Sequence, residues 1–134
     1  MSERILMALS TFGESGDEPV RMLEECGVEV VYNSCGRRLV REEIIQLGAD
    51  CTGVIAGVEP YDREVLDALP NLRCISRCGV GIDNIDLALA AERGIAIRNT
   101  PGAVAQPVAE LAVAMAYDLS RRLSEQTALL RAHK

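Results

Sequence analysis

The sequence predicts an α/β protein with a flavodoxin-like, doubly wound sheet of five parallel strands, followed by one long C-terminal helix. Short apolar runs alternate five times with amphipathic segments over residues 5–99. Strand–helix–strand repeats of this kind join neighbouring parallel strands through right-handed crossovers. Residues 104–134 instead carry apolar residues at helical spacing and show no strand pattern.

The first strand–helix–strand repeat begins the chain. Residues 5–9 are a short apolar run, which predicts a strand. Ser15 and Glu18 have the spacing of a capping box, which predicts a helix that begins there and ends at Gly27. The β-branched run 28–32 predicts the second strand.

The next two repeats lead to the third and fourth strands. The pattern predicts a helix over 40–47 and a strand over 51–57. We expect Asp62 to cap a helix over 62–69, which is followed by the fourth strand at 73–77.

The last repeat follows a glycine-containing turn. Asp83 or Asn84 can cap a helix that Gly94 stops, and residues 95–99 predict the fifth strand. The helix expected over 107–132 would be about 39 Å long at 1.5 Å per residue. Since this is more than a small sheet needs for cover, we expect the helix to pack on something outside the five-strand unit.

The composition excludes several functional classes. The net charge of −6 over 134 residues disfavours nucleic acid, whose phosphates an acidic protein repels. No apolar run reaches the roughly 18 residues that a membrane span needs. The five cysteines include no Cys-x-x-Cys pair, so we expect neither a metal site nor disulfides. Reduced and mostly buried thiols in a cytoplasmic protein are the simpler interpretation.

A Gly-x-Gly turn, Gly79-Val80-Gly81, follows the predicted fourth strand. A dinucleotide fingerprint requires a third glycine three residues later, where this chain has Asn84. The exposed amides of such a turn suit one small carboxylate, with Arg77 beside them to add a charge-assisted bond. The alternative is a tight turn that binds nothing, and composition alone favours that alternative.

A second candidate site lies where the third strand ends, at Ala56 and Gly57. Ligands of open α/β sheets bind beyond the carboxyl ends of the strands, so the turns after strands three and four should face one crevice. We interpret Glu59, in the same loop, as a solvated carboxylate. His133 is the single histidine and is interpreted as a frayed surface residue.

Residues 69–123 closely resemble one family of enzymes. In order along the chain they carry R-x-G-V-G-x-D-N-I-D from Arg77, A-x-x-R-G-I from Ala90, N-T-P-G from Asn99 and V-A-E-L from Val108. This order resembles that of the D-isomer-specific 2-hydroxyacid dehydrogenases, most of all their phosphoglycerate dehydrogenase-like branch. The resemblance extends more loosely over the rest of the chain.

The resemblance implies the substrate-binding lobe of an NAD-dependent oxidoreductase. Residues 1–101 would form a flavodoxin-like substrate-binding domain, and residues 102–134 a lobe-crossing, dimer-forming helix at the start of the NAD-binding lobe. The dinucleotide fingerprint and the catalytic Arg, Glu and His of the family are absent from this sequence. We therefore expect a truncated chain that binds no NAD and has no turnover alone.

The resemblance also implies site residues. The substrate-binding set shares one crevice and consists of Ala56, Gly57, Arg77, Gly79, Val80 and Gly81. Within it, the amides at the positions of Val80 and Gly81 hold the substrate carboxylate. Ala56 stands where phosphoglycerate-type members tend to carry a basic residue, which argues against a phosphorylated substrate. Val108 matches a position on the nicotinamide side.

The implied partners are a small 2-hydroxy or 2-keto acid and a second copy of the chain. The apolar face of the helix over 107–132 predicts a homodimer, with a domain swap through the Thr100–Gly102 hinge as one arrangement. No metal, nucleic acid or membrane is expected. The alternative is a stand-alone flavodoxin-like module that binds a small anion or assembles with a partner, without catalysis.

Overall fold

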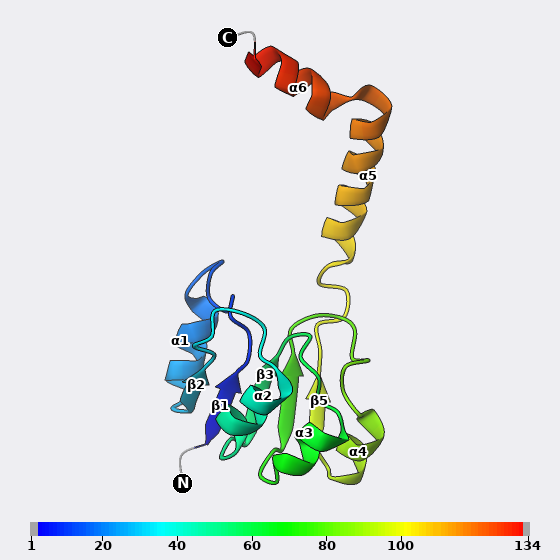
Figure 1. Cartoon of the computed structure of the whole chain (residues 1–134). Coiled ribbons are helices and arrows are strands. Elements are labelled where there is room, and N and C mark those ends of the chain that lie inside the picture. The colour runs from blue at the N-terminus through cyan, green and yellow to red at the C-terminus, as the bar shows by residue number, and fades with distance from the viewer. Residues whose placement is uncertain (1–2, 133–134) are drawn as a thin grey trace. The chain divides into compact units, whose positions relative to one another are not determined.

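The computed structural model describes residues 3–132 and contains one parallel sheet of five strands. The strands are β1 (Arg4–Met7), β2 (Glu29–Tyr32), β3 (Gly53–Ala56), β4 (Cys74–Arg77) and β5 (Ala96–Arg98). Their order is β2-β1-β3-β4-β5, which is the flavodoxin-like order with its reversal at β1 (Figure 1). The predicted fold class is therefore confirmed.

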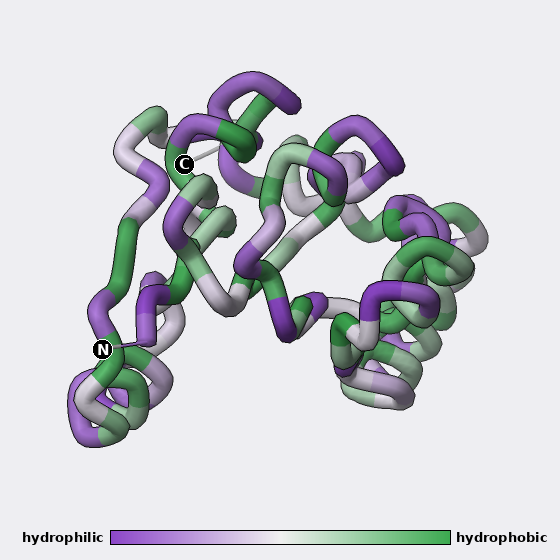
Figure 2. The backbone as a smooth tube through the Cα atoms, turned by 90° about the horizontal axis from the view of Figure 1, so that it is seen from below, coloured by the Kyte–Doolittle hydropathy of each residue, from purple (hydrophilic) through white to green (hydrophobic). Residues whose placement is uncertain are grey.

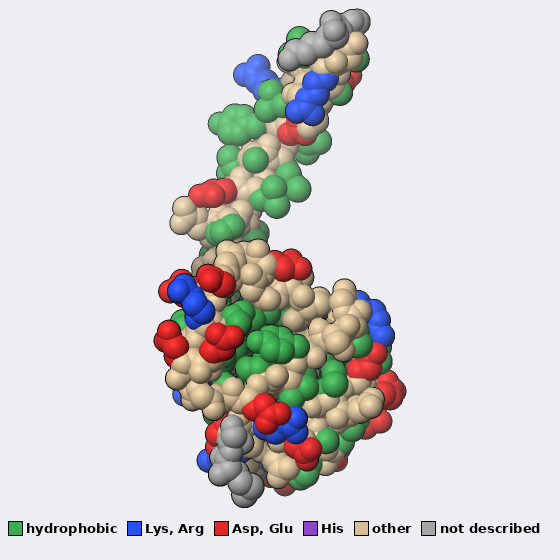
Figure 3. Space-filling model, turned by 90° about the vertical axis from the view of Figure 1, so that its left-hand side faces the viewer, with side chains coloured by type: hydrophobic (Ala, Val, Ile, Leu, Met, Phe, Trp, Pro, Cys, Tyr) green, Lys and Arg blue, Asp and Glu red, His purple; other side chains and the backbone are tan. Residues whose placement is uncertain are grey.

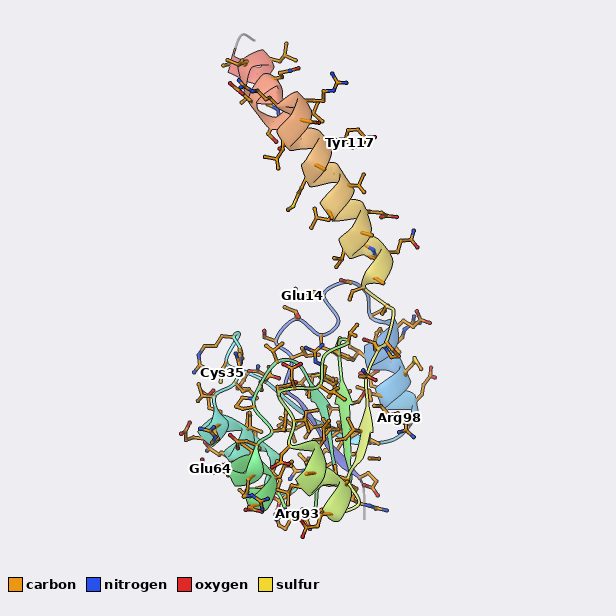
Figure 4. The ribbon with its side chains drawn as sticks, turned by 90° about the vertical axis from the view of Figure 1, so that its right-hand side faces the viewer. Glu14, Cys35, Glu64, Arg93, Arg98 and Tyr117 are labelled. Atoms are coloured by element: carbon orange, nitrogen blue, oxygen red, sulfur yellow. The ribbon has the colours of Figure 1, made fainter. Side chains whose placement is uncertain are left out.

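Helices cover the two faces of this sheet unequally. The helices between strands are α1 (Glu18–Glu25), α2 (Arg41–Gly48), α3 (Arg63–Ala68) and α4 (Leu87–Glu92). Figure 4 shows α2, α3 and α4 on one side of the sheet and α1 on the other. In Figure 2 the chain changes between hydrophobic and hydrophilic residues over short intervals, as amphipathic segments do.

The core lies between the sheet and the three-helix side. Leu6, Val54 and Ile75 are in register across β1, β3 and β4, and all three are buried. Ile44 of α2 and Leu66 of α3 pack into the same cluster. Burial of each of these side chains stabilises the fold by about 1.5–3 kcal/mol. Alternate residues of each strand therefore fix which face carries the core.

The opposite face is barer toward the β5 edge. Ser76, Ala96 and Arg98 belong to the alternate set and are exposed. Figure 4 shows Arg98 on the side of the sheet away from Glu64 of α3. α1 contributes no buried residue to this face.

The helix caps differ in part from the sequence prediction. Asp62 caps α3 as expected, and its carboxylate accepts a hydrogen bond from the Val65 amide at 3.2 Å. α4 is capped by Asp86, which accepts from the Leu89 amide at 3.0 Å, and neither Asp83 nor Asn84 serves as the cap. The chain after Gly81 makes a further turn before it becomes helical, so the first available acceptor lies later than predicted.

The capping box expected at the start of α1 is also absent. Asp17 is the residue before the helix, and it makes no side-chain cap hydrogen bond. Pro19 does lie in the first turn, as expected, because its missing N–H would have no helical partner there.

Residues up to Thr100 and residues from Pro101 form two separate compact units, here called the sheet unit and the helical unit. The helical unit contains α5 (Ala105–Arg121) and α6 (Leu123–Ala132), neither of which has a buried residue. Figure 3 shows hydrophobic side chains standing out along it.

The single helix expected over 107–132 is thus divided at Arg122. That residue has a left-handed conformation with φ 53°, and its amide donates to the Asp118 carbonyl at 2.6 Å. The Asp118 carboxylate accepts from the Ser124 amide at 2.7 Å and from the Ser124 hydroxyl at 2.8 Å. These bonds end one helix and begin the next, although the apolar pattern runs on through both.

None of the five cysteines is paired in a disulfide in this structure. The expectation that most are buried is wrong, since only Cys51 is buried and Cys26, Cys35 and Cys78 are exposed. Helices of the described part of the chain are all too short or too polar to cross a membrane.

Candidate functional site

The loops after β3 and β4 lie side by side at the carboxyl edge of the sheet. Ala56 and Arg77 are register partners at the ends of these strands, and the Cys78 amide donates to the Ala56 carbonyl at 2.8 Å. Further on, Tyr61 and Ile85 form an isolated parallel bridge between the two loops. The structure therefore brings the predicted Ala56–Gly57 loop and the glycine turn together.

The turn at Gly79, Val80 and Gly81 has two of its carbonyls bound, whereas the amides of Val80 and Gly81 are free. The Thr100 amide donates to the Gly79 carbonyl at 3.0 Å, and the Asn99 side-chain amide donates to the Val80 carbonyl at 2.7 Å. The amides of Val80 and Gly81 donate to no group among residues 3–132. Both residues are exposed, so two backbone donors are available to an incoming anion.

Arg77 lies directly over the first glycine of this turn. Its Nη1 donates to the Cys78 carbonyl at 3.0 Å. A Cβ at Gly79 would lie 1.3 Å from the same nitrogen, and Gly79 has a φ of +140°. The φ favours glycine, and any side chain there would have to displace the Arg77 guanidinium. Arg77 pairs with no carboxylate in the described part of the chain, so its charge is available at the turn.

Asp83 places a negative charge on the other side of the turn. A Cβ at Gly81 would lie 2.9 Å from Asp83 Oδ1. Arg77 and Asp83 therefore flank the two free amides with opposite charges. Because a nearby carboxylate repels anions more strongly as their charge rises, this arrangement favours a singly charged ligand over a pyrophosphate.

Gly57 lies in the loop directly after β3, and its amide already has a partner. That amide donates to Glu59 Oε2 at 2.7 Å. A Cβ at Gly57 would approach Leu9 Cδ2 to 2.8 Å, which explains the glycine. The interpretation of Glu59 as a solvated carboxylate is wrong, because the residue is only 3% exposed.

Two other predicted site residues take different positions. Ala56 is fully buried in the core, so it meets the crevice only through its backbone. Val108 lies on α5 in the helical unit and is exposed. His133 lies outside the described residues.

Two cavities lie elsewhere, at the amino-terminal edge of the sheet. One of about 680 Å³ is lined by Ile5, Thr52, Arg73 and Cys74 among others. Its wall includes the exposed Arg73–Glu3 ion pair at 3.3 Å. We favour the glycine turn as the binding site, because ligands of such sheets bind at the carboxyl ends of strands and the free donors lie there.

Among residues 3–132, no group of three or more His, Cys, Asp or Glu side chains is arranged to hold a metal ion.

Sequence reasoning assigned Glu59 and Asn84 other roles and did not single out Asn99, although all three shape this site. Asn84 donates to the carbonyls of Glu59 at 2.7 Å and Gly57 at 3.3 Å. The asparagines were visible as polar residues beside glycine turns, which is a signal for side-chain bonds to backbone. Their partners lie in other loops, and the spacing along the chain does not reveal those.

Comparisons with known proteins agree on one family. The family model described as "D-isomer specific 2-hydroxyacid dehydrogenase, catalytic domain" matches residues 8–132. A glyoxylate reductase of Thermofilum pendens is 37% identical over 111 residues, which are 82% of this chain and 33% of that protein.

Two solved structures have the same fold. The TT0316 protein of Thermus thermophilus matches with a TM-score of 0.82 and 31% identity, over 96% of this chain and 40% of that one. An NAD+-bound 3-phosphoglycerate dehydrogenase of Entamoeba histolytica matches with a TM-score of 0.76 and 32% identity, over 88% of this chain and 39% of that one. This chain therefore spans between a third and two fifths of the length of these three proteins.

Proposed function

The chain belongs to the D-isomer specific 2-hydroxyacid dehydrogenase family, and from this premise we propose that it is a substrate-binding lobe for 2-hydroxy or 2-keto acids. The observation that carries the proposal is the turn of Val80 and Gly81, whose two amides are exposed and have no partner within residues 3–132. These amides bind the substrate carboxylate, and the Arg77 guanidinium adds a positive charge beside them. The lobe thereby orients the substrate for a reaction at its second carbon.

The substrate we infer is a small, unphosphorylated acid. Ala56 is buried and supplies no charge, and Glu59 near it is a buried carboxylate. Asp83 further disfavours a second negative group close to Gly81. The name of the Thermofilum pendens relative, a glyoxylate reductase, is consistent with a small keto acid.

The family's cofactor does not fit this turn. A pyrophosphate site needs a helix N-terminus directly after the glycines, and α4 begins only at Leu87. Asp83 lies next to the turn, where a pyrophosphate would need positive potential. We propose that NAD, which would accept or donate the hydride, is held outside this chain, and that the chain alone has no turnover.

Amide chemical shifts of the 15N-labelled chain, followed during a titration with sodium glyoxylate, test the carboxylate site. We expect saturable shifts confined to Val80, Gly81 and their neighbours. In Gly79→Ala the new methyl group would displace Arg77 and strain the turn, so the shifts should be lost. The matched control is Gly94→Ala, which strains a glycine turn distant from the crevice and should bind normally. Shifts spread over the whole surface would contradict the proposal.

A fluorescence titration with NADH, with and without glyoxylate, tests the second part. We expect neither binding nor oxidation. Saturable NADH binding by the pure chain would mean that a dinucleotide site exists in it, and the glycine turn would then have to be reinterpreted.

A homodimer is the partner assembly that we propose. α5 is apolar on more than one face, with Val108, Leu111, Val113 and Met115 all more than half exposed. A helix with this many exposed apolar side chains is normally covered, which supports a partner for α5. A second copy through the helical unit, by direct packing or by a swap at Thr100–Gly102, would bury it.

Light scattering across micromolar concentrations should give the mass of a dimer, and Leu111→Asp should give that of a monomer without unfolding the sheet unit. A monomer mass for the unmodified chain at every concentration would contradict the dimer.

A further inference from the structure

We propose that Glu59 is a positioning residue that, together with Asn84, clamps the loop after β3 to the loop after β4 and so holds the two free amides in place. The inference rests on the proposed function for the identity of the ligand. The clamp itself is a feature of the ligand-free chain.

Glu59 closes its own loop from inside the protein. Its carboxylate accepts the Gly57 amide at 2.7 Å, and a Cβ at Gly57 would lie 3.1 and 3.2 Å from its two oxygens. The residue is almost fully buried and forms no ion pair with any described arginine. A buried, unpaired carboxylate is costly, since it is removed from water without an opposite charge. That cost makes a purely space-filling role a poor explanation.

Asn84 forms hydrogen bonds with the loop whose conformation Glu59 stabilises. Its side-chain NH2 group donates to the backbone carbonyls of Gly57 and Glu59. The backbone carbonyl of Asn84 accepts the Tyr61 amide at 2.8 Å. The Asp86 amide then donates to the Tyr61 carbonyl at 2.9 Å. Four hydrogen bonds therefore join the two loops within a few residues of the glycine turn.

Tyr61 anchors this junction in the core. Its ring is fully buried, and its hydroxyl has no hydrogen-bond partner within residues 3–132. Burial, and next the charge of Glu59, raise the pKa of the Tyr61 hydroxyl well above its usual value, so it stays neutral. The loop after β3 is thus fixed at Tyr61 by packing in the core and at Gly57 by the hydrogen bond to Glu59.

The glycine turn is held from both sides as a result. Asn84 fixes the chain three residues after Gly81, while Asn99 and Thr100 bind the carbonyls of Val80 and Gly79. Amides that are fixed before binding lose less entropy when an anion arrives, so the clamp contributes to affinity without touching the ligand.

The experiment compares Glu59→Ala, Glu59→Gln and Asn84→Ala with Asp62→Ala as the matched control. Asp62 also holds a backbone amide by its carboxylate, but at the start of α3 and outside the crevice. The first readout is hydrogen exchange of the Tyr61 and Asp86 amides without ligand, and the second is the dissociation constant for glyoxylate.

We expect Glu59→Ala and Asn84→Ala to speed exchange at Tyr61 and Asp86 at least tenfold and to weaken glyoxylate binding about tenfold, which is 1.4 kcal/mol. Glu59→Gln retains an acceptor for the Gly57 amide and should stay within about threefold of the unmodified chain. Asp62→Ala should lower stability while leaving both readouts unchanged.

The clamp is overturned if Glu59→Ala exchanges like the unmodified chain, or if Asp62→Ala produces the same loss. Should Glu59→Ala fail to fold, Asn84→Ala and Glu59→Gln are compared instead. Faster exchange in Asn84→Ala than in Glu59→Gln supports the clamp, and equal exchange overturns it. If exchange follows the expected order but no chain binds glyoxylate, the clamp stands and the proposed carboxylate site fails.

Discussion

The sheet unit and the helical unit have similarly apolar sequences and opposite degrees of burial. In the sheet unit, Leu6, Ile44, Val65 and Ile75 are completely shielded from water. In the helical unit, neither helix buries a residue, and Leu119 is 83% exposed. Apolar periodicity therefore indicates where a helix forms but carries no information on what covers it. The predictions below test this difference, beginning with the largest effect.

Core truncation should separate the two units most clearly. Ile75→Ala removes a fully buried side chain from β4 and should lower the free energy of unfolding by about 2–5 kcal/mol. Leu119→Ala removes an exposed side chain and should change it by less than about 0.5 kcal/mol. Urea denaturation at low protein concentration measures both. A comparable loss for Leu119→Ala would show that the helical unit is buried in solution.

Gly94 in the sheet unit and Arg122 in the helical unit both have a left-handed backbone, so substitutions at them compare the stability of the two units. Gly94 has a φ of +69° with open space around it, so Gly94→Ala adds backbone strain alone, about 1–2 kcal/mol. Arg122→Gly relieves the corresponding strain in the helical unit. Thermal unfolding should show the loss for Gly94→Ala. For Arg122→Gly, only the hydrogen exchange of α6 should slow, and a change in the melting temperature of the sheet unit would contradict the independence of the units.

Substitutions at two aspartates distinguish the observed cap of α4 from the one that the sequence predicted. Asp86→Ala removes the acceptor for the Leu89 amide and should lower the free energy of unfolding by about 1 kcal/mol. Asp83→Ala removes a side chain that accepts no hydrogen bond within residues 3–132 and should have little effect on stability. Chemical denaturation of the two variants is the measurement, and equal losses would contradict the assigned cap.

Acid titration should show the smallest effects, at partly exposed carboxylates of both units. The Arg37 side-chain hydrogen bond, and then the Val40 amide, lower the pKa of Glu43 from 4.5 to about 2. The stabilisation from this lowered pKa is present above pH 4.5 and is lost as pH falls toward 2. In the helical unit, the Ser124 amide and hydroxyl lower the pKa of Asp118.

Carboxyl 13C shifts against pH measure both groups. Arg37→Ala should raise the pKa of Glu43 toward 4.5, and Ser124→Ala should raise that of Asp118. An unchanged Glu43 titration in Arg37→Ala would show that the observed pair does not persist in solution.

The fold was accessible from the sequence, because strand and helix patterns depend on neighbouring residues. The run 51–57 contains β3 and the run 73–77 contains β4, so alternation and turn residues sufficed. The Asp86 cap was missed because Asp83, Asn84 and Asp86 are all acceptable caps, and only the turn after Gly81 selects among them. The break at Arg122 was missed because its bonds compete with a continuous apolar pattern.

The sequence predicts where the candidate site lies along the chain, but it does not predict the contacts that shape the site. The glycines at 79 and 81 mark a tight turn by their residue type, but residue type alone did not show that its amides lack partners. The burial of Glu59 and the bonds of Asn84 depend on how two loops meet, and these loops are about 25 residues apart in the chain. Contacts of that separation follow from the tertiary structure and leave no local pattern.

The anchoring of Asn99 and Thr100 has a mechanical consequence. Both residues bind carbonyls of the glycine turn, so hydrogen bonds tie the chain just after β5 to that turn. The first positive φ after them is at Gly102, with +79°. Because glycine adopts many backbone conformations, we expect changes in chain direction beyond Pro101 to be accommodated at Gly102, two residues past these hydrogen bonds, without breaking them.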